Sequence, residues 1–240
     1  MSLLDALAAS PEPASLKWLA QATELHPSTA HRILGAMTSA RFVERQEAGT
    51  YRLGIRLLEL GNLVKSRINL REIALPFMQR LHETIGEAVN LGVRHDDEII
   101  YIERTSSGRS LVRVVYLVGG RAPLHLTSVG KLFLASDGPQ KVKEYAKRTG
   151  LPGKTPHSLC TLANLEKELD RIRRHDIAFD NEEAELGLKC VAAPIRDDEA
   201  SVVAGLSVSA PTDRHDPDWV DLVKQTADDI SHALGYAAGK

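Results

Sequence analysis

The sequence predicts an α+β protein in which an N-terminal winged helix-turn-helix is joined by a linker helix to a larger domain with an antiparallel sheet. About forty residues from Ser15 to Gly54 read as a helix, a turn, a second helix and a short hairpin. Beyond residue 69, period-2 runs occur in hairpin order among amphipathic helices, as in α+β domains. A chain of 240 residues suits two modest domains. We expect them at 1–54 and 69–240, with the linker helix at 55–68.

The winged helix-turn-helix is predicted element by element. A short helix at 3–9 comes first, and Ser15 is a suitable N-cap for the next helix, which a break at 24–27 ends. Another helix begins at Pro27. Its apolar residues follow i, i+3, i+4, i+7 spacing and predict a buried face: Ala30, Ile33, Leu34 and Met37. Strand-like runs at 42–45 and 50–53, about a turn at 47–49, form the wing.

The polar face of the helix that begins at Pro27 is the candidate DNA-reading surface. Short polar side chains at its start, with an arginine one turn along, suit a helix that enters a major groove. The helix N-terminus and the wing would meet phosphate oxygens. The candidate DNA-binding residues are Ser28, Thr29, His31, Arg32, Arg45 and Arg52. The alternative is an ordinary helical hairpin whose polar face is solvated, and the wing argues against it.

The charge distribution favours a dimer. The whole chain has a net charge of -2, but residues 15–56 hold six basic side chains against three acidic ones. Because this local excess is small, we expect operator affinity to need two copies, in a homodimer or a dimer of dimers. The predicted linker helix has apolar residues on adjacent faces, which indicates a partner helix. A purely internal core helix is the alternative.

The larger domain is expected to begin with a helix at 70–85, with a second start near Pro76. Further helices are expected at 127–136, 139–148, 162–175 and 217–238, and strands at 88–94, 99–103, 111–117, 177–180, 188–194 and 202–210. These strands in hairpin order predict the antiparallel sheet.

Three pieces of this domain suggest a ligand site. The backbone N–H groups at the predicted helix start, Ser128 to Gly130, would favour an anion such as a carboxylate. Ordinary N-capping by Thr127 or Ser128 is the alternative. Strand alternation places Leu188, Cys190 and Ala192 on one face, and Gly205, Ser207 and Ser209 on one face of the next strand. If these faces meet, small polar groups line a cavity; otherwise the serines face solvent.

Two parts of the sequence resemble one family. HPSTAHRILGAM followed by RFVERQEAGTYRLGIRLLELG is similar to the N-terminal domain of the IclR family of bacterial transcriptional regulators. GGRAPLHLTSVGKLFLA, FDNEEAELGLKCVAAPIRDD and VVAGLSVSAP resemble the signature regions of that family's effector-binding domain. The resemblance implies a GAF-like domain that binds small organic molecules, often carboxylates. Relatives generally begin the first helix earlier than this sequence does. By position it implies the effector-binding residues Ser128, Val129, Gly130, Asp180, Leu188, Cys190, Ser207 and Ser209. We expect Asp180 to hold a neighbouring loop or to accept a hydrogen bond from a ligand hydroxyl.

Composition narrows the class. Apolar residues make up 43% of the chain, no apolar run approaches a membrane span, and no secretory signal is visible. Two cysteines, Cys160 and Cys190, fit a reducing compartment, so we expect a cytoplasmic protein without cofactor or metal. Since aromatic content is only 5%, and the plausible apolar lining is Val112, Val114, Tyr116 and Leu188, we expect a small or mid-sized carboxylate effector.

The leading interpretation is therefore a ligand-responsive transcription factor rather than an enzyme. The alternative is a small-molecule enzyme or zinc protein with a vestigial helix-turn-helix, and a third is a module that docks a protein. In an enzyme, Cys190 would be the nucleophile and His125 its base, but nothing in their spacing along the sequence requires the two to meet. A zinc site from His125, Asp180 and Cys190, with His157 or His175, lacks a close Cys/His pair. The direction of regulation, repression or activation, depends on where the operator lies.

Overall fold

The computed structural model describes residues 2–46, 48–65, 69–105 and 118–237, with side chains except at 62–65. The predicted strand at 111–117, and with it Val112, Val114 and Tyr116, lies outside this part of the chain. The chain divides into two compact units, Met1–Ile68 and Asn69–Lys240.

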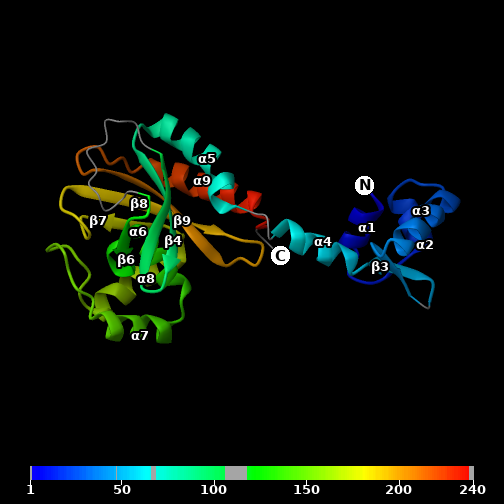
Figure 1. Ribbon diagram of the computed structural model, residues 1–240, viewed down its shortest axis with the longest axis horizontal. Coiled ribbons are helices and arrows are strands. Elements are labelled where there is room, and N and C mark those ends of the chain that lie inside the picture. The colour runs from blue at the N-terminus through cyan, green and yellow to red at the C-terminus, as the bar shows by residue number, and fades with distance from the viewer. Residues whose placement is uncertain (1, 47, 66–68, 106–117, 238–240) are drawn as a thin grey trace. The chain divides into compact units, whose positions relative to one another are not determined.

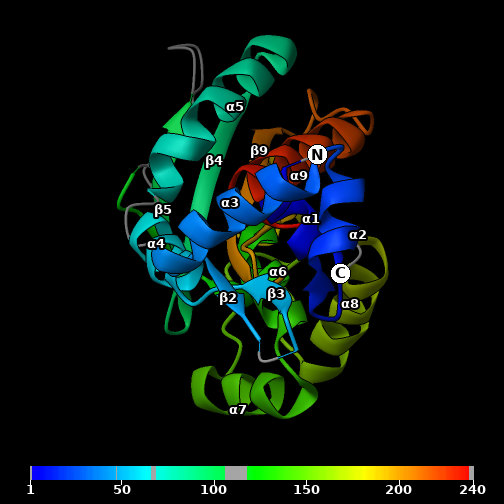
Figure 2. The ribbon, with the colours of Figure 1, turned by 90° about the vertical axis from the view of Figure 1, so that its right-hand side faces the viewer.

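The smaller unit is a winged helix-turn-helix, as predicted (Figure 2). Its elements are α1 (Leu3–Ala9), β1 (Ala14–Ser15), α2 (Leu16–Ala22), α3 (Pro27–Ser39), β2 (Val43–Arg45), β3 (Thr50–Leu53) and α4 (Arg56–Lys65). Ser15 caps α2, since its Oγ accepts a hydrogen bond from the Trp18 N–H at 3.3 Å. Strand β1 was not predicted from the sequence; it pairs with β3, so the sheet order is β1-β3-β2.

One small core holds these helices and the sheet together. Its buried members come from α1, α2, α3 and the sheet: Leu3, Ala6, Leu7, Ala14, Leu19, Leu34, Val43 and Tyr51. Gly54 follows the wing where a Cβ atom would lie 2.2 Å from the Arg41 carbonyl oxygen. Only glycine allows this approach, so the hairpin can return against the end of α3.

The larger unit is built on one antiparallel sheet of six strands in the order β6-β5-β4-β9-β8-β7. The strands are β4 (Ala88–His95), β5 (Glu98–Thr105), β6 (Arg121–Pro123), β7 (Ala178–Asn181), β8 (Leu188–Arg196) and β9 (Val202–Pro211). The helices are α5 (Leu70–Ile85), the 3₁₀ turn η2 (Leu124–Leu126), α6 (Ser128–Ser136), α7 (Pro139–Thr149), α8 (Leu162–His175) and α9 (Trp219–Ala233).

Helices cover both faces of this sheet (Figure 1). Helices α5 and α9 pack on one face, where strand residues such as Val89, Leu206 and Val208 form an apolar core. Helices α6, α7 and α8 and strand residues such as Tyr101 and Cys190 form a second core on the other face. The alternation predicted for β8 and β9 is confirmed. Cys190 and Ala192 of β8 lie opposite Ser209 and Ser207 of β9, whereas Val191, Leu206 and Val208 belong to the core on the other face.

Helices α5 and α9 differ from the sequence prediction in their course. Helix α5 runs through Pro76 without a second start. Packing of its buried face against the sheet offsets the roughly 3 kcal/mol that an internal proline costs. Helix α9 ends at Ala233 instead of Ala238, because Gly235 takes φ = +95°, which is incompatible with a helix.

A β-bulge interrupts the pairing of β4 with β5. Gly92 lies opposite Tyr101 while Leu91 lies opposite Glu103, so Ile102 is an extra residue in β5. Strict alternation beyond Tyr101 therefore fails, and the residues after the bulge face the opposite way from what the period-2 pattern predicts.

Candidate functional site

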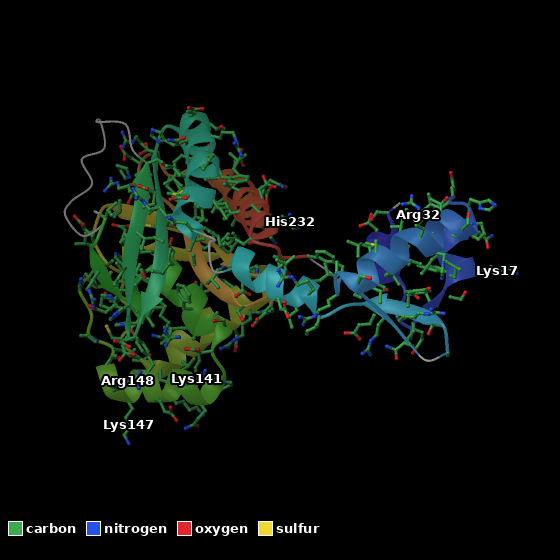
Figure 3. All side chains as sticks on the ribbon, turned by 45° about the vertical axis from the view of Figure 1, so that its right-hand side comes forward. Lys17, Arg32, Lys141, Lys147, Arg148 and His232 are labelled. Atoms are coloured by element: carbon green, nitrogen blue, oxygen red, sulfur yellow. The ribbon has the colours of Figure 1, made fainter. Side chains whose placement is uncertain are left out.

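Helix α3 presents the predicted polar row to solvent. Ala30 and Leu34 are fully buried in the small core, while Ser28, His31 and Arg32 are exposed and Thr29 is half-buried. Figure 3 shows Arg32 on the outside of α3. The structure therefore places these four residues on one helix, at its N-terminal end, as the sequence predicts.

The start of α3 has a cap that was not predicted. His26 precedes Pro27, and its Nδ1 accepts a hydrogen bond from the Ser28 backbone N–H at 3.4 Å. The same ring nitrogen lies 2.8 Å from Ser28 Oγ. The Ser28 side chain is therefore engaged in the cap as well as exposed, whereas Arg32 has no such local partner among the described residues.

Some basic residues of the smaller unit form ion pairs with acidic neighbours, and others do not. Arg52 and Glu44 are cross-strand neighbours in the wing and form an ion pair with 2.7 Å between Nη2 and Oε2. Arg41 and Arg56 both pair with Glu59. In contrast, three basic side chains form no ion pair with any described residue: Lys17, Arg32 and Arg45. The unpaired cations are thus on α2, on α3 and in the wing.

The N-terminus of α6 lies buried against the sheet. Ser128, Val129 and Gly130 are all buried, and Thr127 Oγ1 accepts a hydrogen bond from the Gly130 N–H at 3.0 Å. The N-capping alternative therefore holds for this amide. A Cβ atom at Gly130 would lie 2.3 Å from the Leu124 carbonyl oxygen, so glycine is required for the close approach of η2.

Val129 fixes α6 over two glycines of the sheet. A Cβ atom at Gly205 would lie 2.8 Å from Val129 Cγ1, and one at Gly92 would lie 3.1 Å from it. Since these glycines are cross-strand partners in β4 and β9, the helix rests directly on backbone. This contact places the start of α6 beside the polar residues of the same sheet face.

Five buried polar residues gather on that face, and we call them the polar cluster: Asn90, Asp180, Cys190, Ser207 and Ser209. They come from four neighbouring strands. Cys190 lies opposite both Asp180 and Ser209, and its Sγ is 3.1 Å from Ser209 Oγ. Asn90 lies opposite Ser207 and its Nδ2 donates to Ser209 Oγ at 3.1 Å. Leu188 is buried on the same face. The predicted strand residues are thus brought together.

Asp180 holds the loop between β7 and β8. Its Oδ1 accepts hydrogen bonds from the backbone N–H groups of Glu183, at 2.7 Å, and Ala184, at 3.3 Å. Burial raises the pKa of Asp180 to about 7; the nearby Lys131 opposes this rise and Glu183 adds to it. With this pKa, the Asp180 carboxyl group changes between its neutral and charged forms near neutral pH.

A buried ion pair joins α6 to the same loop. Lys131 Nζ lies 2.6 Å from Glu183 Oε2, and both side chains are almost fully buried. Burial raises the pKa of Glu183, and Lys131 counters this effect. Sequence reasoning missed this pair, because 52 residues separate its members in the chain and neither lies in a spacing motif.

Asn90 is a further residue that sequence reasoning missed. It is fully buried, and its Oδ1 has no hydrogen-bond partner among the described residues. Leaving such an atom unpaired costs about 1–3 kcal/mol. The only signal in the sequence is a single asparagine in an apolar strand, and its pairing with Ser207 of the distant strand β9 could not be read from hairpin order.

The geometry does not support the enzyme and zinc alternatives. His125 is buried with its Nδ1 2.7 Å from Tyr145 Oη and its Nε2 3.2 Å from the Pro152 carbonyl oxygen. Both of its ring nitrogens are thus engaged by partners other than Cys190. Burial lowers the pKa of His125. Within the described ranges, no three metal-ligating side chains group together, and His157 and His175 are exposed. None of the helices described combines the length and apolar character needed to span a bilayer.

Comparison with known proteins agrees with this geometry. Residues 1–47 match the IclR helix-turn-helix domain, and residues 63–232 match the bacterial transcriptional regulator IclR C-terminal domain. The HTH-type transcriptional repressor AllR of Salmonella typhi is 33% identical, over 98% of this chain and 88% of its own length.

Two solved structures are also similar. The Agobacterium tumefaciens repressor BlcR has a TM-score of 0.86 and 26% identity, covering 98% of this chain and 95% of that chain. An IclR homolog from Microbacterium hydrocarbonoxydans, complexed with 4-hydroxybenzoate, has a TM-score of 0.65 and 29% identity, covering 97% and 95%. These matches describe a DNA-binding regulator with an effector-binding domain, which is not an enzyme. The chain therefore belongs to the IclR family of bacterial transcriptional regulators.

Proposed function

We propose that this regulator binds a small organic acid at the polar cluster and that the acid changes its affinity for operator DNA. The observation that carries the proposal is the unpartnered end of the buried Asn90 amide, which lies among the hydroxyl groups of Ser207 and Ser209. A buried polar group that lacks a partner is satisfied when a ligand supplies one. The polar cluster is thus suited to a small molecule that has several hydrogen-bonding groups.

The proposed effector site comprises the polar cluster, the wall residue Leu188, and Ser128, Val129 and Gly130 at the start of α6. The α6 N-terminus contributes a positive potential to this face. A relative of the same family, the Microbacterium hydrocarbonoxydans homolog, is known in complex with 4-hydroxybenzoate, which is a carboxylate. This complex supports an organic acid as the ligand class, while the acid that this chain binds is open to experiment.

On the DNA side, we propose that α3 enters the major groove. Ser28, Thr29, His31 and Arg32 would contact base edges or phosphates, and Arg45 and Arg52 would lie near the backbone. Arg52 exchanges its partner Glu44 for phosphate in this arrangement, which costs part of the affinity it supplies. We therefore expect Arg32 and Arg45 to contribute more than Arg52.

We also propose a homodimer, or a dimer of dimers, in the cytoplasm. Three large apolar side chains at the end of the smaller unit are exposed in the single chain: Leu53 at 39%, Ile55 at 48% and Leu58 at 60%. Burial of such side chains favours a partner surface. Two copies would double the few unpaired cations on one palindromic site. The effector then acts by preferring one spacing of the paired winged domains, which is a population shift.

The test measures operator binding by fluorescence anisotropy, on a duplex selected by the protein from random sequence. A thermal-shift screen of small organic acids identifies the effector, because a ligand of the native state raises its melting temperature. We expect Arg32→Ala to weaken DNA binding about 10- to 100-fold and to lower the salt slope by about 1, with the effector response retained.

The matched variant is Ser207→Ala/Ser209→Ala. We expect it to bind the duplex as the wild type does and to lose most of its response to the acid. If the double variant keeps full affinity for the acid, the effector site is elsewhere. If Arg32→Ala keeps full affinity and salt dependence, α3 is not the reading helix.

A further inference from the structure

The β-bulge at Ile102 determines which face of the sheet receives Arg104. Ile99 and Tyr101 belong to the α6-side core. Regular alternation would place Glu103 with them and direct Arg104 toward α5. Instead, Ile102 is the extra residue, and after it the faces are exchanged.

Contacts on both sides of Arg104 establish this exchange. Glu103 pairs with Arg71 of α5, with 2.6 Å between Oε2 and Nε. Thr105 Oγ1 donates to the Met78 carbonyl oxygen, also on α5. Because neighbours in a strand point to opposite faces, Arg104 lies on the α6 face. Its cross-strand partner there is Asn90, a member of the polar cluster.

The surroundings of Arg104 connect it with the rest of the cluster. Its side chain is half-buried and its Nε is fully buried. Burial raises the pKa of Tyr101 well above its usual value; the charges of Cys190 and Asp180 raise this pKa further, and that of Arg104 lowers it. Tyr101 therefore lies within electrostatic reach of a cation on β5 and of a carboxyl group on β7.

The two ends of this sheet face differ in the charges that they present to a bound acid. At the β7 end, Asp180 repels an acid group when ionised, and the charge of Lys131 is matched by Glu183 at 2.6 Å. The Gly130 N–H is used by Thr127. At the β5 end, Arg104 supplies a guanidinium group, which binds carboxylates in a bidentate manner. A carboxylate is thus attracted by the Arg104 guanidinium group beside β5 and repelled by an ionised Asp180 beside β7.

We propose that Arg104 binds the acid group of the effector, with the Asn90 amide as a second contact, while Asp180 and the serine hydroxyls hold a polar group at the other end of the molecule. This inference rests on the proposed effector function and assigns the orientation and class of the ligand. The oxygen and nitrogen atoms of the Asn90 side-chain amide can be exchanged by rotation of the amide group. When its Oδ1 accepts the Ser209 hydroxyl proton, its Nδ2 donates to the acid. The effector is then a short carboxylate with a hydroxyl, carbonyl or amide group distant from the acid.

The experiment compares each acid with the neutral amide of the same skeleton, by isothermal titration calorimetry on the full chain. The probes are 4-hydroxybenzoate with 4-hydroxybenzamide, 4-hydroxybutanoate with 4-hydroxybutanamide, and succinamate with succinamide. For the acid that binds most tightly, we expect the wild type to prefer the acid over its amide at least 10-fold. Arg104→Met should weaken acid binding about 10- to 100-fold and leave amide binding unchanged, and Arg104→Lys should retain part of the preference.

Arg121→Met is the matched control. Arg121 lies on the neighbouring strand β6, is exposed and pairs with Glu98, so its loss should leave both affinities at the wild-type value. Operator binding and the melting temperature of each variant report folding. If Arg104→Met binds the acid as the wild type does, the inference is wrong and the proposed function stands. Equal affinity of the wild type for an acid and its amide also overturns the inference, without any variant. If no acid binds the wild type, both the proposed effector function and this inference are wrong.

Discussion

The two faces of the six-stranded sheet are made by alternate residues of the same strands, yet they differ in character. Toward α5 and α9, β4, β8 and β9 contribute aliphatic side chains such as Leu91, Val191 and Leu206. Toward α6, the same strands contribute two glycines and, together with Asp180 of β7, the polar cluster. The apolar face supplies burial energy, and this allows the opposite face to hold polar groups that cost stability. The apolar and polar faces are thus separated by a single residue step along each strand.

Among changes that test this difference between the two faces, we expect the largest loss of stability at the buried ion pair of Lys131 and Glu183. Lys131→Met leaves the almost fully buried Glu183 carboxyl group without its partner, and should lower the free energy of unfolding by about 3–5 kcal/mol at neutral pH. Urea denaturation measures this change. Adding Glu183→Gln should recover much of the loss, whereas Lys147→Met on the exposed side of α7 should change little. A loss below about 1 kcal/mol would show that the pair is not buried in solution.

A somewhat smaller effect is expected on the apolar face. Leu206→Ala removes a fully buried side chain and should lower the free energy of unfolding by about 3 kcal/mol. The same measurement on Leu222→Ala, at a partly exposed position of α9, should show less than half of that change. Affinity for the acid should stay the same in both variants. A large loss of affinity in Leu206→Ala would break the division of labour between the two faces.

The smallest of the three effects concerns Asp180 and pH. Burial raises its folded-state pKa to about 7, above the value near 4 of an unfolded chain. The native state therefore keeps a proton that the unfolded state has lost, and stability falls as pH rises between these values. From pH 5 to pH 7 the contribution lost is about 2 kcal/mol.

Asp180→Asn should remove this slope, as measured by urea denaturation at both pH values. Asp221→Asn, at an exposed position of α9, is the control and should keep the slope. If wild type and Asp180→Asn show the same pH dependence, the Asp180 carboxyl group is ionised throughout this range.

Much of the fold could be predicted from the sequence, because periodicity is a local signal. Helix α8 spans Leu162–His175 as predicted, and the cap of α2 was identified from Ser15. Strand β1 could not be predicted, since it has two residues and forms only by pairing with β3. The early end of α9 depends on one residue at positive φ, Gly235.

The candidate site was predictable only in part, because it depends on register. Alternation placed Cys190 on one face of its strand and Ser209 on one face of the next, and the structure adds that the two residues are cross-strand partners. Asn90 was missed because β4 had no polar pattern, and Arg104 because the bulge reverses alternation in β5. DNA-binding and effector-binding roles for the named residues remain predictions.

The burial of Cys190 has a consequence for thiol chemistry. The chain has two cysteines, neither in a disulfide, and the structure leaves Cys160 exposed and Cys190 buried. An alkylating reagent therefore reaches Cys160 first, and it reaches Cys190 only when the region around the polar cluster opens. With Cys160→Ser as background, the alkylation rate of Cys190 becomes an intrinsic reporter of how often that opening occurs, without any attached dye.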